Sequence, residues 1–138
     1  MPANATAKVD FRLVPNQDPD DIRAKLRAHL DANGFDDIAI SVTGGYFPAK
    51  IDPDDPFVQI AAEAATEAFG VEAVIEPILG VSGPMSWFTA NLPGMPIVTA
   101  GAGYPGGKVH APNEHVKIDL FVSAIKQTAR IIGRFGTS

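Results

Sequence analysis

The sequence predicts an α/β fold, in which helices alternate with short apolar strands of a parallel sheet. Apolar residues recur at every second position in several segments and at every third or fourth position in others, which are the periods of strands and helices. With 46% hydrophobic and 20% charged residues, the composition is that of a globular protein. The 138 residues are enough to bury one ordinary core.

Two half-buried strands are predicted near the amino terminus, at residues 7–14 and 38–42. In each of them apolar and polar side chains alternate, so that one face meets a core and the other meets water or a partner. The apolar members are Val9, Phe11 and Leu13 in the first strand and Ile38, Ile40 and Val42 in the second.

An amphipathic helix is predicted between these strands, from Pro19 to about Gly34. Asp18 can accept hydrogen bonds from the free amides of the first turn, and Pro19 suits the first helical position, where no amide is needed. The apolar side chains that recur at every fourth position are Ile22, Leu26 and Leu30. Gly34 can adopt the left-handed conformation that ends a helix. The first third of the chain therefore predicts strand, helix and strand.

A cluster of prolines and acids at residues 52–56 predicts a boundary. The run Asp-Pro-Asp-Asp-Pro has two prolines and three aspartates within five residues, which forbids regular structure. We therefore expect one unit in residues 1–51 and another in residues 52–138. The second unit predicts the order helix, strand, helix, strand, helix around a parallel sheet. Its elements fall at residues 57–69, 74–79, 85–88, 97–100 and 119–132.

The net charge of −5, without a run of Lys or Arg, argues against nucleic acid and anionic membranes as partners, because both need a clustered positive face. No apolar stretch approaches the roughly 20 residues of a membrane-spanning helix. The amino terminus has neither a basic start nor an apolar secretory core, and the chain has no cysteine for disulfides. These observations predict a cytoplasmic protein.

Three short motifs match catalytic or nucleotide-binding patterns, and each has a simpler interpretation. Residues 101–106 fit GxGxxG, but prolines interrupt the helix that must follow to bind a phosphate. Residues 123–126 spell SxxK without the two further elements of serine acyl enzymes. His29 and Asp31 form HxD at the end of the predicted helix, where a histidine interacts favourably with the helix dipole. We interpret all three as structural.

His110 is the strongest candidate for chemistry in the chain. It lies in a glycine-rich loop after the predicted strand 97–100, and the carboxyl ends of parallel strands form the crevice where α/β sheets bind ligands. Pro112 stiffens this loop, and Asn113 and Glu114 can bond its amides or the second ring nitrogen, as metal ligands require. A lone histidine is also compatible with a structural role, since a metal site needs several ligands.

Five segments follow one another in a recognisable order. They are Val9 to Pro15, Gln17 to Pro19, Gly80 to Met85, Gly103 to Pro105 and His110 to Glu114. Together they resemble the co-catalytic zinc exopeptidases, a family that includes aminoacylases, carnosinase-like dipeptidases and succinyl-diaminopimelate desuccinylases. The resemblance spans nearly the whole chain.

The resemblance implies a two-zinc catalytic domain interrupted by a smaller, ferredoxin-like lid of β-α-β-β-α-β topology, which commonly mediates dimerisation. Residues 1–51 then correspond to the strand-helix-strand second half of the lid, and residues 52–138 to the last αβαβα segment of the catalytic domain. His110 falls on the family's last zinc ligand. Ser82 and Gly83 fall in the turn that is implied to bind the carboxylate of the substrate.

Most catalytic groups of that family have no counterpart in this sequence. The metal-bridging aspartate, the Glu-Glu pair that includes the general base and the first histidine all precede the lid, and this chain contains no Glu-Glu pair. Val81 also replaces a glycine that many relatives carry. One imidazole provides neither two zinc ions nor a base for the attacking water. We therefore expect no catalytic residue here and no hydrolysis by the chain alone.

Three functions remain open from the sequence. The first is the carboxy-terminal part of a two-zinc enzyme that hydrolyses a peptide or N-acyl amide bond next to a free carboxylate, with the missing amino-terminal half as partner. The second is a stand-alone dimerisation module without catalysis. The third is a small protein that binds metal through His110 at a subunit interface. The apolar surface left by a missing half predicts self-association, and thus a homo-oligomer.

Overall fold

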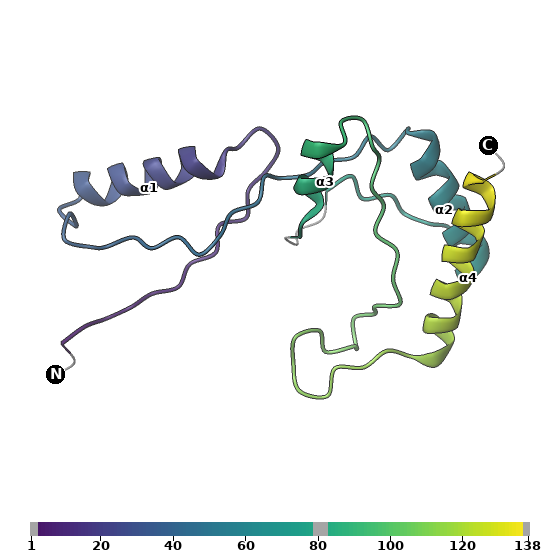
Figure 1. Cartoon of the computed structure of the whole chain (residues 1–138). Coiled ribbons are helices and arrows are strands. Elements are labelled where there is room, and N and C mark those ends of the chain that lie inside the picture. Colours follow the sequence, from purple (N-terminus) through teal and green to yellow (C-terminus); the bar gives the residue numbers. More distant parts are fainter. Residues whose placement is uncertain (1–2, 79–82, 137–138) are drawn as a thin grey trace. The chain divides into compact units, whose positions relative to one another are not determined.

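The structure of the protein is a computed structural model that describes residues 3–78 and 83–136 (Figure 1). These residues contain the helices α1 (Pro19–Ala32), α2 (Pro56–Phe69), α3 (Met85–Asn91) and α4 (Ile118–Phe135). The chain divides into two compact units, one made of Met1–Lys50 with Ile78–Pro93 and the other of Ile51–Pro77 with Gly94–Ser138. Helices α1 and α3 belong to the first unit, and α2 and α4 to the second. Among the described residues, no helix is long and apolar enough to cross a membrane.

Helix α1 begins as its sequence predicts. Oδ1 of Asp18 accepts hydrogen bonds from the amides of Asp20 (2.7 Å) and Asp21 (3.2 Å), and Pro19 occupies the first turn. After the helix, Gly34 has a φ of 78°, a value that residues with side chains rarely adopt. The chain therefore turns at the glycine that the sequence indicates.

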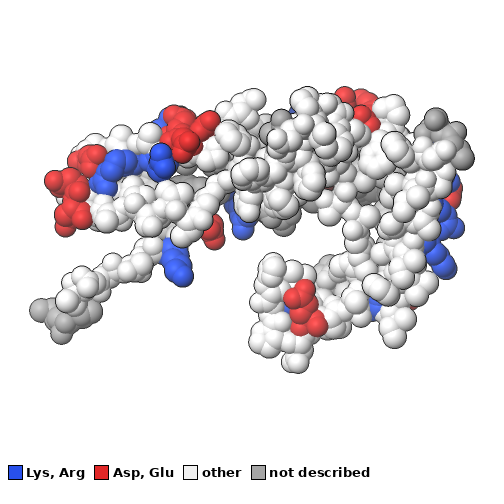
Figure 2. Space-filling view, in the orientation of Figure 1, with Lys and Arg blue, Asp and Glu red and all other residues white. Residues whose placement is uncertain are grey.

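Arg27 ties α1 to the segment that follows it. Its guanidinium donates hydrogen bonds to the carbonyl oxygens of Ile38 (2.6 Å) and Phe35 (2.9 Å), and it pairs with Asp31 (2.6 Å) on the same helix. Figure 2 shows acidic and basic side chains next to one another along α1. Because a planar guanidinium can bind two carbonyl oxygens at once, Arg27 fixes the path of the chain after the helix.

Helices α2 and α4 pack side by side and form the core of the second unit (Figure 1). Asp55 begins α2 by accepting a hydrogen bond from the amide of Phe57 (2.8 Å), and Gly70, with a φ of 71°, ends it. The rings of Phe57 and Phe135 meet edge-on, with centroids 5.6 Å apart. The buried side chains of α2 are the small residues Val58, Ala61 and Ala64. Small side chains at a contact allow two helices to approach closely.

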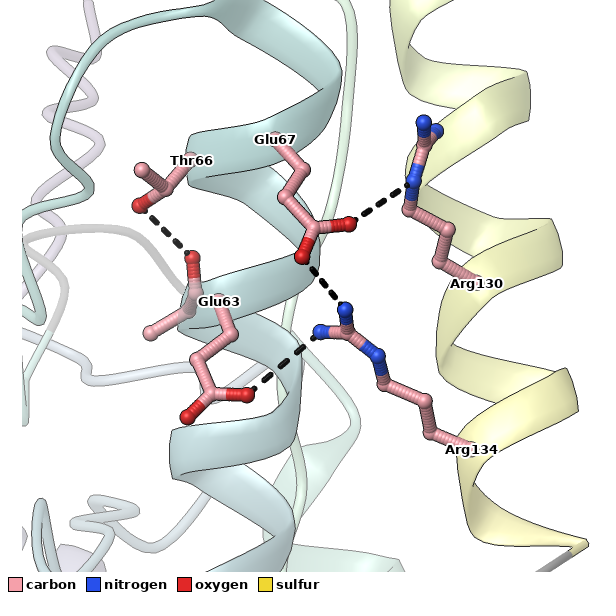
Figure 3. A network of polar contacts seen from close by, with 6 residues as sticks. Glu63, Thr66, Glu67, Arg130 and Arg134 are labelled. Atoms are coloured by element: carbon pink, nitrogen blue, oxygen red, sulfur yellow. Dashed lines mark hydrogen bonds and ion pairs between the residues drawn. The ribbon is translucent and has the colours of Figure 1, made fainter.

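Two arginines of α4 converge on one glutamate of α2 (Figure 3). Nε of Arg130 lies 3.1 Å from Oε2 of Glu67, and Nη2 of Arg134 lies 2.5 Å from Oε1 of the same carboxylate. Nη1 of Arg134 also reaches Glu63 at 3.5 Å. The hydrogen bond from Arg134 lowers the pKa of Glu67 below its ordinary value, helped by the charges of both arginines, although desolvation acts in the opposite direction.

Helix α4 exposes its apolar side. Ile118, Ile125 and Ile132 recur at every seventh position and therefore share one face of the helix, where they are 81%, 54% and 68% exposed. Arg130 and Arg134, which meet α2, project from the opposite side of the helix. The contact between α2 and α4 thus leaves this row of isoleucines uncovered among the described residues.

The predicted α/β fold is wrong for the residues that the structure describes. They contain no strand, so neither the strand-helix-strand half of a ferredoxin-like lid nor a parallel sheet is present. A strand requires a ladder of backbone hydrogen bonds to a neighbouring strand. In residues 3–78 and 83–136, the bond from the amide of Ile51 to the carbonyl oxygen of Pro77 (3.1 Å) joins two non-helical segments, and one bond does not make a ladder.

The missing ladders also explain the exposure of the predicted strands. Val9, which the alternation of residues 7–14 predicts to face a core, is 69% exposed. Phe11 and Val42 are exposed as well. Alternating hydrophobicity specifies which face of a strand is apolar, but the surface that covers this face must come from another element.

Lowering the pH is expected to weaken the α2–α4 contact through Glu67. Because the fold holds the pKa of Glu67 below its value in the unfolded chain, the ionised carboxylate stabilises the fold above the unfolded-state pKa. That contribution is lost as the pH falls through the folded-state pKa. Glu67→Gln should therefore lower the free energy of unfolding at about pH 7 and have no effect at about pH 2, as measured by urea unfolding.

The matched control for this experiment is Glu72→Gln. Glu72 is exposed and lies just after α2, where it makes no ion pair with any described residue. This variant should leave the free energy of unfolding unchanged at either pH. An equal loss in the two variants would contradict the role assigned to Glu67.

Replacing Arg27 by lysine is expected to loosen the carboxyl end of α1. Lysine keeps the charge but cannot donate to two carbonyl oxygens in the plane of a guanidinium, so about 1 kcal/mol of local stability should be lost. Hydrogen exchange of the Ile38 amide, which donates to the carbonyl oxygen of Phe35 at 3.2 Å, measures this loss. Arg23→Lys is the control, because Arg23 makes an exposed pair with Asp20 at 3.4 Å. Equal exchange rates in the two variants would refute the prediction.

Candidate functional site

The loop that carries His110 folds into three successive turns and returns to its starting point. The turns are closed by backbone hydrogen bonds from Gly107 to Tyr104 (2.9 Å), from Ala111 to Lys108 (2.9 Å) and from Glu114 to Ala111 (3.2 Å). A further bond, from the amide of His115 to the carbonyl oxygen of Gly107 (3.0 Å), joins the two ends of the loop. Residues 104–115 are therefore an ordered loop that reverses the chain before α4.

Proline and asparagine determine the last of these turns. Pro112 occupies its second position, for which the proline ring fixes a suitable φ, and Asn113 occupies its third position with a φ of 62°. Asparagine tolerates this left-handed conformation better than most residues. The sequence Ala-Pro-Asn-Glu thus accounts for the turn that follows His110.

His110 is exposed and lies at the third position of the middle turn. Its φ is 61°, which is uncommon for a residue other than glycine. Its amide donates to Oε2 of Glu114 at 3.3 Å. Its ring makes no hydrogen bond with any described residue, so the ring nitrogen without a hydrogen is available to bind a metal ion.

Tyr104 and His115 face one another at the base of the loop. The hydroxyl oxygen of Tyr104 lies 2.6 Å from Nε2 of His115, and the two rings meet edge-on with centroids 5.7 Å apart. Nδ1 of His115 lies 2.9 Å from the carbonyl oxygen of Asn113, which can only accept, so Nδ1 carries the hydrogen. In the neutral ring, Nε2 then accepts a hydrogen bond from the tyrosine hydroxyl. Nζ of Lys117 lies 4.7 Å from the centre of the Tyr104 ring.

Two glycines make room for this arrangement. A Cβ on Gly106 would lie 2.5 Å from Cε2 of Tyr104, and a Cβ on Gly107 would lie 3.0 Å from the carbonyl oxygen of His115. Gly107 is also buried. The close approach of the tyrosine ring and of the returning backbone therefore explains why this loop contains adjacent glycines.

The other predicted site residues are not brought to His110 by anything that the structure describes. Ser82 lies outside the described residues. Gly83 precedes α3 and is half-buried, and it belongs to a different compact unit from His110. The binding of a carboxylate by Ser82 and Gly83 remains a prediction. His29 lies in the last turn of α1, as its structural interpretation requires.

His110 by itself does not form a metal site. Within residues 3–78 and 83–136, no three His, Asp or Glu side chains come together in a group that could hold a metal ion. Zinc sites in proteins use three or four such ligands. The exposed imidazole of His110 fits the role of one ligand, but the described part of the chain does not supply the others.

The sequence singled out His110 as the candidate ligand, which stays a prediction, and it did not indicate the contact between Tyr104 and His115. His115 has no patterned neighbour and is exposed, which made it indistinguishable from a surface residue. The available signal was the run Tyr-Pro-Gly-Gly at residues 104–107, because a tyrosine followed by a turn with two glycines indicates a ring packed closely against backbone.

Comparison with known proteins identifies relatives along nearly the whole chain. The family model described as peptidase family M20/M25/M40 matches residues 2–134. A Staphylococcus epidermidis protein named "Probable succinyl-diaminopimelate desuccinylase" is 23% identical over 127 residues, which cover 91% of this chain and 31% of that protein. The crystal structure of a M20 family metallo-carboxypeptidase from Sulfolobus solfataricus matches with a TM-score of 0.82 and 29% identity, over 98% of this chain and 34% of that chain. The chain thus spans about a third of the length of both relatives.

Gly106→Ala is expected to displace the Tyr104 ring, whereas Gly101→Ala should be tolerated. The added Cβ at residue 106 would overlap the ring, while nothing lies within 4 Å of a Cβ on Gly101. Because Gly106 is exposed, the overlap should move the ring rather than unfold the protein. In NMR spectra, the ring resonances of Tyr104 and His115 should shift in the first variant and stay in place in the second. Ring resonances that do not move in Gly106→Ala would contradict the described contact.

Proposed function

The chain belongs to the peptidase family M20/M25/M40, and we propose that it acts as the carboxy-terminal part of a zinc-dependent hydrolase. The resemblance drawn from the sequence is thereby confirmed at the level of the family. The complete enzyme would hydrolyse a peptide or N-acyl amide bond next to a free carboxylate. In this proposal, residues 1–51 belong to the lid and residues 52–138 to the catalytic domain.

The loop around His110 is the observation that carries the proposal. It presents an exposed imidazole whose ring has no hydrogen-bond partner among the described residues, in a backbone conformation that several contacts maintain. Neutral imidazole is a common zinc ligand. The chain spans about a third of the length of its relatives, so the other ligands would come from sequence that is not part of it.

Two zinc ions, when bound, would acidify a water molecule and polarise the carbonyl group of the substrate. The contribution of this chain would be to hold the imidazole of His110 in place and to bind the substrate. A general base must also take a proton from the attacking water. We assign that role to no residue of this chain, and the chain alone should not hydrolyse substrate.

The exposed apolar face of α4 supports the proposal that a further part of the enzyme packs against this chain. Ile118, Ile125 and Ile132 form a stripe that α2 does not cover. An apolar face of this kind is usually buried against another surface. We assign it to the remaining part of the enzyme, and in the absence of that part we expect the chain to associate with itself.

The substrate side of the proposal rests on Ser82 and Gly83, where the sequence predicts a turn and of which Ser82 lies outside the described residues. A backbone turn that leads into a helix offers free amides, which suit a carboxylate group. The relatives named as a desuccinylase and a carboxypeptidase both have substrates with such groups by their names. A chain without cysteine is compatible with the reducing cytoplasm, where we place the enzyme.

A second candidate function is a stand-alone module that dimerises without catalysis. The observation in its favour is the same exposed stripe on α4, which two copies of the chain would bury against each other. Adding a separately expressed amino-terminal part of a relative distinguishes the two functions. The module would remain a homodimer, whereas the enzyme part would form a one-to-one complex.

His110→Ala is expected to abolish activity in the complete enzyme that carries this sequence. Loss of partners that only orient a zinc ligand costs about 10–100-fold in metal affinity or activity, so loss of the ligand itself should lower kcat by more than about 100-fold. Zinc content, measured by elemental analysis, should fall with it. The substrates to assay are N-succinyl and N-acetyl amino acids and dipeptides.

His29→Ala is the matched control, since His29 lies on the last turn of α1 in the other compact unit. It should leave zinc content and kcat unchanged. Zinc content that is the same in His110→Ala as in the unmodified enzyme would reject the proposed function, as would hydrolysis by the 138-residue chain alone.

A further inference from the structure

We propose that Tyr104 and His115 are positioning residues for His110. Their hydrogen bond closes the base of the loop and keeps the imidazole of His110 where a metal ion can bind it. This inference rests on the proposed function, because it takes His110 to be a ligand. Neither residue contacts the imidazole of His110 among the described residues, so both would act through the conformation of the loop.

The backbone of the loop requires such a constraint. Lys108, His110 and Asn113 have φ values of 56°, 61° and 62°, so three residues other than glycine adopt the left-handed conformation within six positions. Each such residue is unfavourable by itself and persists where the surrounding structure determines it. A loop with this conformation would otherwise relax, and His110 would move with it.

Two linked hydrogen bonds lead from Tyr104 to Asn113, and a third joins the next residue, Glu114, to His110. The tyrosine hydroxyl donates to Nε2 of His115 (2.6 Å), and Nδ1 of His115 donates to the carbonyl oxygen of Asn113 (2.9 Å). Asn113 lies in the turn that ends at Glu114, whose carboxylate accepts from the amide of His110 (3.3 Å). The tyrosine hydroxyl therefore acts on the turn at residues 111–114 through His115, and that turn carries the carboxylate that accepts from the His110 amide.

The ring of Tyr104 and its hydroxyl have separable roles. The ring packs where a Cβ on residue 106 would lie, and the ammonium group of Lys117 lies 4.7 Å from its centre. Tyr104→Phe keeps the ring in this space and removes only the hydrogen bond to His115. The variant therefore tests the hydrogen bond without creating a cavity.

The experiment compares Tyr104→Phe with Tyr46→Phe in the complete enzyme that carries this sequence. Tyr46 is exposed, lies in the other compact unit and makes no hydrogen bond with any described residue. Tyr104→Phe should weaken zinc binding about tenfold in competition with a chelator and lower kcat with little change in KM. Tyr46→Phe should change neither quantity.

A second measurement needs no metal. In NMR spectra of the zinc-free enzyme, Tyr104→Phe should shift the His110 and Glu114 amide resonances and accelerate their hydrogen exchange, while Tyr46→Phe leaves them in place. His115→Gln keeps an acceptor for the tyrosine hydroxyl, so it should retain more zinc affinity than His115→Ala. Equal effects of these two substitutions, or zinc affinity and His110 resonances that are unchanged in Tyr104→Phe, would overturn the inference.

The outcomes also separate this inference from the proposed function. If His110→Ala leaves zinc content unchanged, the proposed function fails, whatever happens to the loop. If His110→Ala removes zinc and Tyr104→Phe has no effect on zinc affinity, the proposed function stands and the positioning role fails. Loss of zinc affinity in both variants, with a shift of the His110 resonances in Tyr104→Phe, supports the two together.

Discussion

The packing of α4 against α2 decides which surfaces of the second compact unit are buried. Arg130 and Arg134 of α4 converge on Glu67, the rings of Phe57 and Phe135 meet edge-on, and the small residues of α2 allow the close approach. Ion pairs between partly exposed side chains contribute little each, but this geometry orients the helix. The stripe of isoleucines consequently points away from α2. Its burial depends on a surface outside the described residues, which is the reason for proposing a larger assembly.

The loop between residues 104 and 115 presents on this unit the imidazole that we propose as a zinc ligand. The contacts around His110 maintain an unfavourable backbone conformation, and the described residues add no further metal ligands beside it. Strained backbone of this kind is found where function requires one geometry. In the proposed enzyme, a chain that spans about a third of the length of its relatives would contribute this group to a centre whose other ligands lie elsewhere.

The helix ends depend on residues close by in the sequence, whereas the predicted strands depend on distant ones. Asp18 accepts bonds from amides two and three residues away, and Gly70 ends α2 by its own left-handed conformation, so both ends could be predicted from neighbouring residues. The alternation around Val9 predicted a strand, but a strand depends on hydrogen bonds to a neighbour that no residue nearby in sequence supplies. The α/β fold was therefore the prediction that failed.

By itself, the sequence determined the start of α1, both ends of α2, the family and His110 as the candidate ligand, because caps, turns and motifs depend on residues close together in the chain. It did not determine the carboxyl end of α4, which continues through Gly133 to Phe135. Only the tertiary structure decided that α4 meets α2 through its arginines and that Tyr104 bonds to His115. These contacts join positions that are 63 and 11 residues apart. Such pairs form when turns and packing bring distant residues together. The pattern of residues along one segment does not specify which distant residues will meet.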